Sequence, residues 1–493
     1  MYKKFTKAGL IQNFPHPGDF STNLRVIIQG YRECLNHGAD IVFAPAAALC
    51  GLEPRDLTLR RSFYFQCRAA LDALAKEVTT APLILGAYTI VEGKDAAYVG
   101  LTAGEDEEDY WRSKDMDLDL VPFLIESNSV TEMTANELSF VEGNTVYVDM
   151  TEEEQMPDIT ADFIVRMPSK PWYATSFQDD YELRCWEASL GDSIVVCIRP
   201  AGTCAGNVYG GGSGVYTKEG GAIGRLPLFE PGVKVFDSKR NTRPLPLPEP
   251  VEQMAMGIQK GIRDNVRNNC FSGVCIPLDH PHSALMALLA VEAIGAANVC
   301  GISFDPENKL ASHIGISCLT PPTAKLEEEL AHTLGEEEKA ALIDRMHTAI
   351  ALTHAESRGL MLFSPLARRH IMLGEFRLYG QSGGHYAPLG TLYDIDVYLL
   401  SAYYKEKNPD AIGTLGLPPD SYTCRIIHEL ADLNTPPSDL LNDRNFLFKE
   451  SDVRLIQRKI LASALRRSQL PVVMHVDPIE EQLRFPIMHR MND

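Results

Sequence analysis

The chain has 493 residues, of which 45% are hydrophobic and 23% charged, and this composition excludes a wholly disordered chain or a fibrous repeat. Its 66 acidic and 46 basic residues give a formal net charge of −20, which opposes non-specific binding to nucleic acid. No apolar run reaches the roughly 20 residues of a membrane span, and the first residues lack the apolar core of a signal peptide. We therefore expect a cytoplasmic protein with two or three domains and no membrane partner.

The eleven cysteines are scattered along the chain, without a C-x-x-C pair or the spacing of a zinc site. Reduced thiols are the rule in a cytoplasm. The cysteine pattern therefore predicts neither a disulfide framework nor a structural metal.

Helices and short apolar strands alternate through the first half of the chain. Residues 24–36 have the apolar spacing of a helix, and a glycine stop leads from them into a buried strand at residues 41–44. Further strands are predicted at residues 83–91, 145–148, 163–165 and 194–198, with a helix at residues 181–190. The acidic stretch at residues 105–119 predicts an exposed loop. This alternation indicates layered α/β structure.

A proline-rich segment, RPLPLPEP at residues 243–250, marks the predicted domain boundary. We predict domains at residues 1–240 and 253–493, joined by a linker at residues 241–252. After the linker, the order helix 251–269, strand 271–278, helix 283–294 and strand 299–304 predicts a parallel sheet with a right-handed crossover. Other elements are expected as helices at residues 326–334, 337–356 and 453–468 and as a strand at residues 360–363.

Several segments carry a resemblance to a known family. The first half contains GDFSTNLRVIIQGYRECLNHGADIVFAPAAALCGLEPRDL, and the second contains YGQSGGHYAPLGTLYDIDVYLLSAYY, a TPPS loop, ALRRSQLP and RFPIMHRM. In order and spacing, the chain resembles glutamine-dependent NAD⁺ synthetase over nearly its whole length. The resemblance implies a nitrilase-like αββα sandwich followed by a doubly wound parallel sheet of the adenine-nucleotide hydrolase-like kind.

The resemblance also identifies positions at which the family's chemical residues are replaced. In the glutaminase half, the base position is Ala46, the nucleophile position is Ser169, and Lys114 aligns with the lysine that stabilises the oxyanion. A serine without a neighbouring base is a poor nucleophile. Cys204 is the better of two weak alternative nucleophiles, since Cys197 ends an apolar strand and is expected in the core.

The synthetase half departs from the family in the same way. The segment that cradles pyrophosphate in the family aligns with Leu278, Asp279, His280, Pro281, His282 and Ser283, without its glycines. The crevice is further expected to be lined by Arg368, Arg369, His370, Gln381 and Asp394. Asp394 reverses the charge of the family's lysine, and Pro281 has no N–H group to offer a phosphate. The segments that maintain the fold thus match the family, whereas the residues that would react or bind ligand differ from it.

The replacements themselves suggest two alternative sites. Asp279, His280 and His282 could ligate a metal, although no third histidine or cysteine has readable spacing, and a solvated loop tip is the competing interpretation. Arg368, Arg369 and His370 could bind an anion at the sheet edge where open α/β proteins place ligands, or form a solvated basic turn.

Three hypotheses follow. The first is a catalytically silent paralogue of glutamine-dependent NAD⁺ synthetase, with a structural or regulatory role in NAD metabolism. The second is an active synthetase that makes NAD⁺ from deamido-NAD⁺, ATP and glutamine or ammonia. The third is an enzyme or binding protein with a new ligand in the old crevice. We expect no cofactor, with ATP and Mg²⁺ only if the family activity is retained. We also expect a homo-oligomer, possible association with an active NAD⁺ synthetase, and no nucleic-acid partner.

Overall fold

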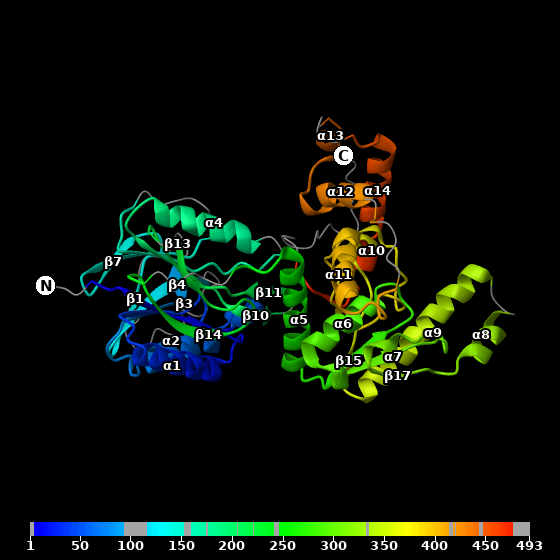
Figure 1. Ribbon diagram of the computed structural model, residues 1–493, viewed down its shortest axis with the longest axis horizontal. Helices are drawn as coiled ribbons and strands as arrows, with labels where there is room; N and C mark the ends of the chain where they lie inside the picture. Colours follow the sequence, from blue (N-terminus) through cyan, green and yellow to red (C-terminus); the bar gives the residue numbers. More distant parts are fainter. Residues whose placement is uncertain are drawn as a thin grey trace. The chain divides into compact units, whose positions relative to one another are not determined.

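The chain folds into two compact units (Figure 1). The computed structural model describes residues 4–92, 116–151, 159–173, 176–204, 206–219, 221–240, 246–331, 335–413, 418–419, 421–442 and 447–476. Unit 1 comprises Met1–Cys204 and Tyr209–Leu247, and unit 2 comprises Ala205–Val208 and Pro248–Asp493. Residues 250–252 of the predicted linker belong to a helix, α5 (Pro250–Asn268), because proline is tolerated in the first turn of a helix.

Unit 1 is built on two six-stranded sheets. The first has the order β14-β1-β2-β3-β4-β5 and consists of β1 (Lys7–Gln12), β2 (Ile41–Phe43), β3 (Leu83–Glu92), β4 (Met116–Glu126), β5 (Ser129–Glu132) and β14 (Gly232–Asp237). The second has the order β13-β12-β9-β8-β7-β6 and consists of β6 (Leu138–Val141), β7 (Asn144–Asp149), β8 (Phe163–Arg166), β9 (Ile194–Cys197), β12 (Gly214–Thr217) and β13 (Gly221–Arg225). Two further short strands are β10 (Ala201–Cys204) and β11 (Asn207–Gly210).

The alternation of side chains along β8 shows how the layers of unit 1 arise. Phe163 and Val165 are buried in the core between the two sheets. Ile164 points the other way and packs in a second core with Ala188 of helix α4 (Ser176–Ser189). A strand with apolar residues on both faces is covered on both faces, so β8 lies between a sheet and a helix.

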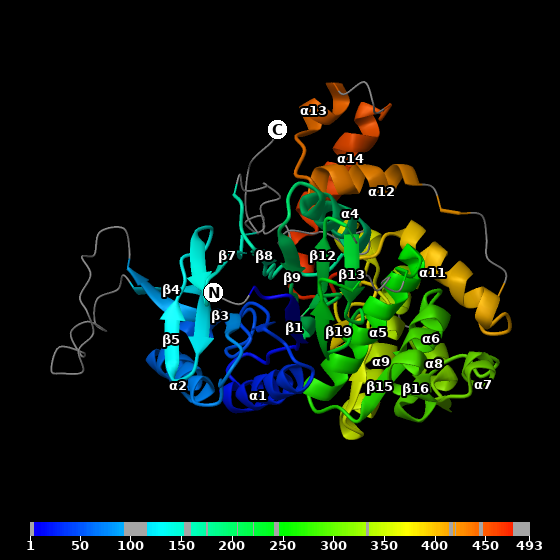
Figure 2. The same cartoon turned by 60° about the vertical axis from the view of Figure 1, so that its left-hand side comes forward.

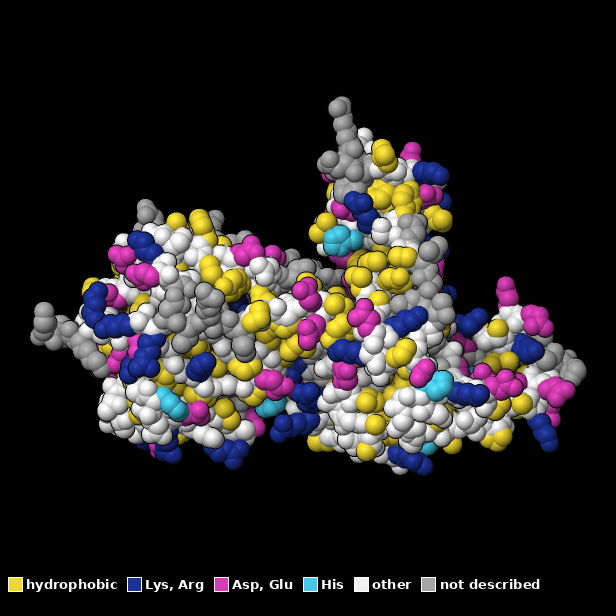
Figure 3. Space-filling model, viewed as in Figure 1, with side chains coloured by type: hydrophobic (Ala, Val, Ile, Leu, Met, Phe, Trp, Pro, Cys, Tyr) yellow, Lys and Arg dark blue, Asp and Glu magenta, His cyan; other side chains and the backbone are white. Residues whose placement is uncertain are grey.

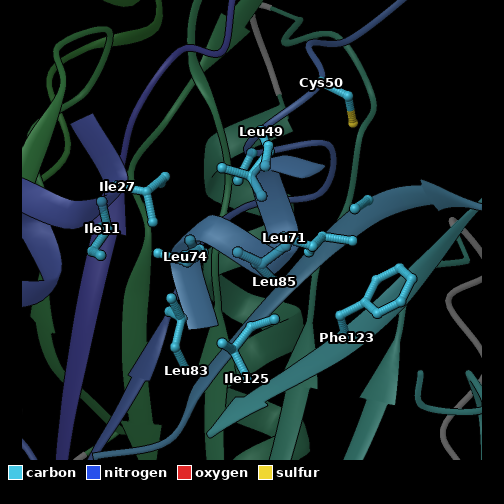
Figure 4. Packing of buried hydrophobic residues seen from close by; sticks show 14 of the residues in the cluster. Ile11, Ile27, Leu49, Cys50, Leu71, Leu74, Leu83, Leu85, Phe123 and Ile125 are labelled. Atoms are coloured by element: carbon cyan, nitrogen blue, oxygen red, sulfur yellow. The ribbon is translucent and has the colours of Figure 1, made fainter. Parts of the chain in front are cut away.

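Helices α1 (Phe20–Asn36) and α2 (Arg61–Ala75) cover the outer face of the first sheet and lie on the opposite side of unit 1 from α4 (Figure 1). Figure 4 shows Leu71 and Leu74 of α2 against Leu83 and Leu85 of β3. Asp19 caps α1 by accepting a hydrogen bond from the Thr22 N–H at 3.1 Å. The order helix, sheet, sheet, helix is the αββα sandwich that the resemblance predicts.

The prediction of an exposed acidic loop at residues 105–119 is wrong for its last four residues. Residues 116–119 belong to β4, which pairs antiparallel with β3 from Met116 to Ile125. Leu118 and Leu120 pack against the core of unit 1, and their alternation with Asp117 and Asp119 is the period of a strand. The rest of the acidic stretch lies outside the described residues.

Unit 2 contains a four-stranded parallel sheet in the order β17-β16-β15-β18. Its strands are β15 (Gly273–Pro277), β16 (Val299–Ile302), β17 (Ser317–Leu319) and β18 (Leu360–Leu362). A small parallel pair consists of β19 (Tyr386–Ala387) and β20 (Val472–Val473). The other helices are α6 (Ser283–Ile294), α7 (Leu310–Ile314), α8 (Ala324–Ala331), α9 (Glu336–Ser357), α10 (Arg368–Leu373), α11 (Asp394–Lys407), α12 (Ser421–Ile427), α13 (Pro437–Asn442), α14 (Glu450–Ala462) and α15 (Ala464–Arg467).

Helices cover both faces of this sheet, which confirms the doubly wound architecture. Helices α5, α6 and α11 contact one another and lie together on one side (Figure 2). On the other side, Ala351 and Ala355 of α9 pack against Cys275 and Leu362 of the sheet. The strand order reverses between β15 and β18, and open α/β sheets bind ligands at the carboxyl ends of the strands beside such a reversal.

The single helix predicted at residues 453–468 is two helices, α14 and α15, which meet at Ser463. The buried Ser463 hydroxyl donates to the carbonyl oxygens of Met372 and Ile460 at 2.8 and 2.9 Å. Serine competes for backbone acceptors in this way, and the competition interrupts helices.

On the molecular surface, basic side chains are interspersed with acidic ones over the face that Figure 3 shows. Among the residues that the structure describes, no helix is long and apolar enough to cross a membrane.

We predict that the inter-sheet core dominates the stability of unit 1. Phe163 is fully buried and its ring centre lies 6.0 Å from that of Phe43. Phe163→Ala should cost about 3–5 kcal/mol of unfolding free energy. Urea unfolding followed by tryptophan fluorescence measures unit 1 alone, because all three tryptophans precede residue 187. Phe140→Ala is the control, since Phe140 is 76% exposed. Equal effects of the two substitutions would contradict the prediction.

Candidate functional site

The candidate site of unit 2 lies where the loops after β15 and β18 meet. The first loop, Leu278 to Ser283, leads directly into α6, and the second leads from β18 to α10. His282 Nδ1 donates to the Pro365 carbonyl oxygen at 3.0 Å and so joins the two loops. The loop Leu278 to Ser283 and the start of α10 therefore lie at the reversal point of the sheet.

Three amide groups of the loop between β15 and α6 donate hydrogen bonds within the loop. The His280 N–H donates to the Ser283 hydroxyl at 3.1 Å, and the His282 N–H donates to His280 Nδ1 at 3.2 Å. The Ser283 N–H donates to the His280 carbonyl oxygen, and Pro281 has no N–H group. A phosphate cradle needs such amides free to point at the ligand. In this loop they already have acceptors.

Asp279 is held on the side of β16. Its carboxylate accepts hydrogen bonds from the Ser303 hydroxyl at 2.5 Å, the Phe304 N–H at 2.6 Å and the Asn308 amide at 3.1 Å. These donors fix the segment that follows β16. Asp279 therefore stabilises a neighbouring loop.

Three histidines gather where the loops after β15 and β18 meet. The ring centres of His280 and His282 lie 4.9 Å apart, and His370 of α10 lies 6.3 and 5.7 Å from them. Burial, and then the charges of the other two rings, lower the pKa of His280 to about 3. Burial likewise lowers the pKa values of His282 and His370. All three rings are therefore neutral at pH 7 and bring no positive charge to the crevice.

The arginines beside the histidines are engaged by carboxylates. Arg368 is buried and paired with Asp432, which also accepts a hydrogen bond from Tyr393. Arg369 Nε lies 2.7 Å from an oxygen of Asp394, and its Nη1 lies 3.1 Å from Glu375. The two arginines were predicted as an anion site or as a solvated turn. The structure places both in ion pairs with acidic residues close to α10, and Arg369 remains partly exposed.

Asp394 and Gln381 have separate surroundings. Asp394 begins α11 and holds Arg369, so the charge opposite to the family's lysine is matched inside the chain. Gln381 lines a pocket of about 500 Å³ with Arg345, Arg377 and Arg466. The sequence grouped these two residues into one crevice, whereas the structure gives each its own partners.

The proposed metal set does not form. Among the described residues, no group of three or more histidine, cysteine, aspartate or glutamate side chains is arranged to hold a metal ion. Asp279 is turned toward β16 by its three donors, and His282 Nδ1 is used by Pro365. The competing interpretation of the segment, a loop held by its own polar contacts, fits these hydrogen bonds.

In unit 1, the family's base position is part of an apolar core. Ala46 is fully buried in the core between the sheets. A Cβ built on Gly86 would lie 2.9 Å from the Ala46 Cα and 2.7 Å from the Met150 methyl group, so all three residues are in close packing. The side chain of Ala46 cannot accept a proton.

The other residues considered for glutamine hydrolysis are Ser169, Lys114 and the two cysteines, Cys204 and Cys197. Ser169 is half-buried in the loop after β8, and Lys114 lies outside the described residues. The Cys204 thiol contacts the Leu52 carbonyl oxygen at 3.8 Å, and burial raises its pKa to about 11. Cys197 is fully buried beside α4, as expected of a core residue. At neutral pH, neither thiol is activated as a nucleophile.

A pocket of about 690 Å³ lies beside Ser169, between the end of β8 and α4. Its aromatic lining includes Trp172, Tyr173 and Trp186. The indole nitrogen of Trp172 is buried without a hydrogen-bond partner among the described residues. The pocket is also lined by charged side chains, which were not predicted from the sequence as part of a site.

Ion pairs at this pocket link three arginines to three carboxylates. Arg166 pairs with Asp149 and, at 2.6 Å, with Glu187; Arg184 reaches Glu187 at 2.5 Å, and Arg199 pairs with Asp180. In the sequence, Asp180, Arg184 and Glu187 recur at the spacing of one helix face. This spacing is the sequence feature that could have indicated the ion pairs. Removing one partner of a buried pair costs about 3–5 kcal/mol, so the network fixes α4 on the sheet.

Comparisons with known proteins agree with this architecture. Residues 254–413 match the family model described as NAD synthase. Over 435 residues, 79% of this chain and 76% of the relative, the chain is 24% identical to glutamine-dependent NAD(+) synthetase of Rhodobacter capsulatus. It is 22% identical to the Synechocystis enzyme of the same name, over 89% of this chain and 90% of the relative.

Two solved structures share the fold over almost the whole chain. A glutamine-dependent NAD(+) synthetase from Cytophaga hutchinsonii superposes with a TM-score of 0.78 at 14% identity, covering 99% of this chain and 98% of that one. The enzyme from Acinetobacter baumannii, in complex with ADP, gives a TM-score of 0.73 at 17% identity, covering 98% of each chain. Together with the sequence matches, these structures show that the chain is similar to glutamine-dependent NAD⁺ synthetases in sequence over most of its length and in fold over almost all of it.

Proposed function

We propose that this chain is a catalytically silent member of the glutamine-dependent NAD⁺ synthetase family, with a structural or regulatory role in NAD metabolism. The observation that carries the proposal is the loop between β15 and α6, whose His280, His282 and Ser283 amides donate within the loop. A triphosphate would have to break these hydrogen bonds to reach the amides. Each of these hydrogen bonds between neutral groups contributes about 0.5–1.5 kcal/mol, so the loop opposes ATP binding.

Charge in the crevice supports the same proposal. Arg368 and Arg369 precede His370 on α10, and both are paired with carboxylates of this chain. The histidine pKa values are lowered, so the rings add no cation at neutral pH. Binding of a phosphate chain relies on positive charges that are not already in ion pairs and on free N–H groups.

In unit 1, Ala46 and Ser169 support the loss of glutamine hydrolysis. An amidase of this kind needs a base, an oxyanion donor and a thiolate that act as one unit. Ala46 lies in an apolar core and cannot take a proton. Ser169 has a hydroxyl group in place of the thiol.

The second candidate is an active NAD⁺ synthetase. It is favoured by the relatives, which carry that name and align over three quarters or more of their length. In this case the loop between β15 and α6 would rearrange when ATP and Mg²⁺ bind.

We expect neither half-reaction to proceed. The unmodified protein should release ammonia from glutamine, and pyrophosphate from ATP with deamido-NAD⁺, at less than ~0.1 per second, roughly a hundredfold below a median enzyme. Ala46→Glu and Ser169→Cys should each stay at that level, because groups that act as a unit are non-additive. An active relative is assayed alongside as the positive control. Faster turnover by the unmodified protein would establish the second candidate.

The neutral histidines predict a stability that falls in acid. A histidine whose folded pKa lies below its unfolded value near 6.5 stabilises the fold above pH 6.5, and this stabilisation is lost as the pH falls toward 3. At pH 5, His280 alone should account for at most about 2 kcal/mol. Hydrogen exchange of β15 and α6 at pH 7 and pH 5 should therefore show a smaller pH effect in His280→Gln. The exposed His313 provides the control His313→Gln, and equal pH effects in both variants would refute the account.

A silent chain acts through partners, and we propose that it forms a homo-oligomer or associates with an active NAD⁺ synthetase. Leu447 and Leu455 near α14 are 93% and 53% exposed and are available for such contacts. We expect light scattering to find species larger than the 54.6 kDa chain, alone or mixed with an active synthetase. The chain mass alone in both samples would contradict this part of the proposal.

A further inference from the structure

Two cysteines stand side by side in the parallel sheet of unit 2. Cys275 of β15 and Cys300 of β16 are register partners. Partners in adjacent parallel strands point to the same face of the sheet. That face is covered by α9, whose Ala351 and Ala355 pack against Cys275. The two thiols therefore meet beneath one helix.

The spacing of the two strands suits a covalent link. Adjacent strands lie about 4.7–4.9 Å apart, and disulfides join Cα atoms about 4.4–6.8 Å apart. Each of the two thiols is the first cause of the other's pKa shift, raising that of Cys275 and lowering that of Cys300. A bond between Cys275 and Cys300 thus requires little movement of the backbone.

The same helix brings an imidazole to one of the thiols. His354 Nε2 of α9 lies 3.8 Å from the Cys300 sulfur. The hydrogen bond from Cys275, and then that from His354, lower the pKa of the Cys300 thiol, whereas the pKa of Cys275 is raised. Cys300 is thus equipped as the attacking thiolate and Cys275 as the second thiol.

Access also distinguishes the two cysteines. Cys300 is 8% exposed and lies next to the edge strand β17, where its register partner Ser317 is exposed, whereas Cys275 is fully buried. The other pair of interacting thiols, Cys50 and Cys67, is fully buried in unit 1 and serves as an internal comparison. A small oxidant therefore reaches Cys300 before it reaches either member of that pair.

We propose that Cys300 is an oxidation site, at which a hydroperoxide forms a sulfenic acid that Cys275 resolves to a disulfide. This proposal is independent of the proposed function.

The atoms and electrons balance in two steps. First, the Cys300 thiolate attacks the outer peroxide oxygen; an S–O bond forms, the O–O bond breaks, and the leaving alkoxide or hydroxide takes a proton from His354 or water. Second, the Cys275 sulfur attacks the Cys300 sulfur, an S–S bond forms, and the S–O oxygen leaves as water with the Cys275 proton. In sum, two thiols lose two electrons, and one hydroperoxide becomes an alcohol, or water when hydrogen peroxide is used.

The test treats the full-length protein with hydrogen peroxide at pH 7 and maps its thiols by mass spectrometry. We expect a peptide pair joined through Cys275 and Cys300 and lighter by two hydrogens. In Cys275→Ser, dimedone should instead trap a sulfenic acid on Cys300. In His354→Gln, the rate of Cys300 oxidation should fall about tenfold, since fewer thiols are ionised.

Cys318→Ser and Cys67→Ser are the matched controls, because Cys318 is exposed on β17 and Cys67 belongs to the buried pair. Both should give the same Cys275–Cys300 link as the unmodified chain. Oxidation of Cys318 or Cys270 while Cys300 stays reduced would overturn the proposal. An unchanged Cys300 rate in a folded His354→Gln, verified by circular dichroism, would also overturn it.

Discussion

The hydrogen bond from His282 to the Pro365 carbonyl oxygen is the contact on which the crevice of unit 2 depends. It joins the loops after β15 and β18, the two strands between which the strand order reverses. With His282 held there, its own N–H reaches His280 Nδ1, and the His280 N–H reaches Ser283. The hydrogen bond that His280 Nδ1 accepts requires a neutral His280 ring, which the buried position provides. The loop is therefore a self-contained turn at the position where related folds place a ligand.

Ion pairs have a similar role in both units. Asp394 and Arg369 face each other in unit 2, so each charge that departs from the family pattern is balanced by another. In unit 1, Arg166 and Arg199 end or follow strands and are matched by carboxylates, among them Asp180 of α4. Buried charges are tolerated only when paired, and both groups obey this rule. In both units, these charges are compensated within the chain.

Much of the architecture could be predicted from short apolar runs. The strands β7, β8, β9 and β15 are continuous apolar segments, and burial on both faces gives them that pattern. The strands β12, β13 and β14 could not be found in this way, because glycines such as Gly214 and Gly232 interrupt their apolar pattern. Sequence reasoning also placed the residues of the loop before α6 correctly at a strand's carboxyl end.

Partnerships between distant side chains were not predictable. His370 joins His280 and His282 only through the packing of α10, and Arg369 finds Asp394 only because α10 and α11 adjoin. Cys275 and Cys300 look unrelated until the register of β15 and β16 is known. Such pairs depend on tertiary geometry, which no local spacing encodes.

Calorimetric titration of the full chain with ATP and Mg²⁺ tests the central claim most directly, because it measures the crevice without requiring turnover. The account predicts no binding heat up to millimolar nucleotide, since the amides of the loop before α6 and the arginines of α10 already have partners. Saturable binding with a Kd of about 10 μM or below, roughly −7 kcal/mol, would contradict it.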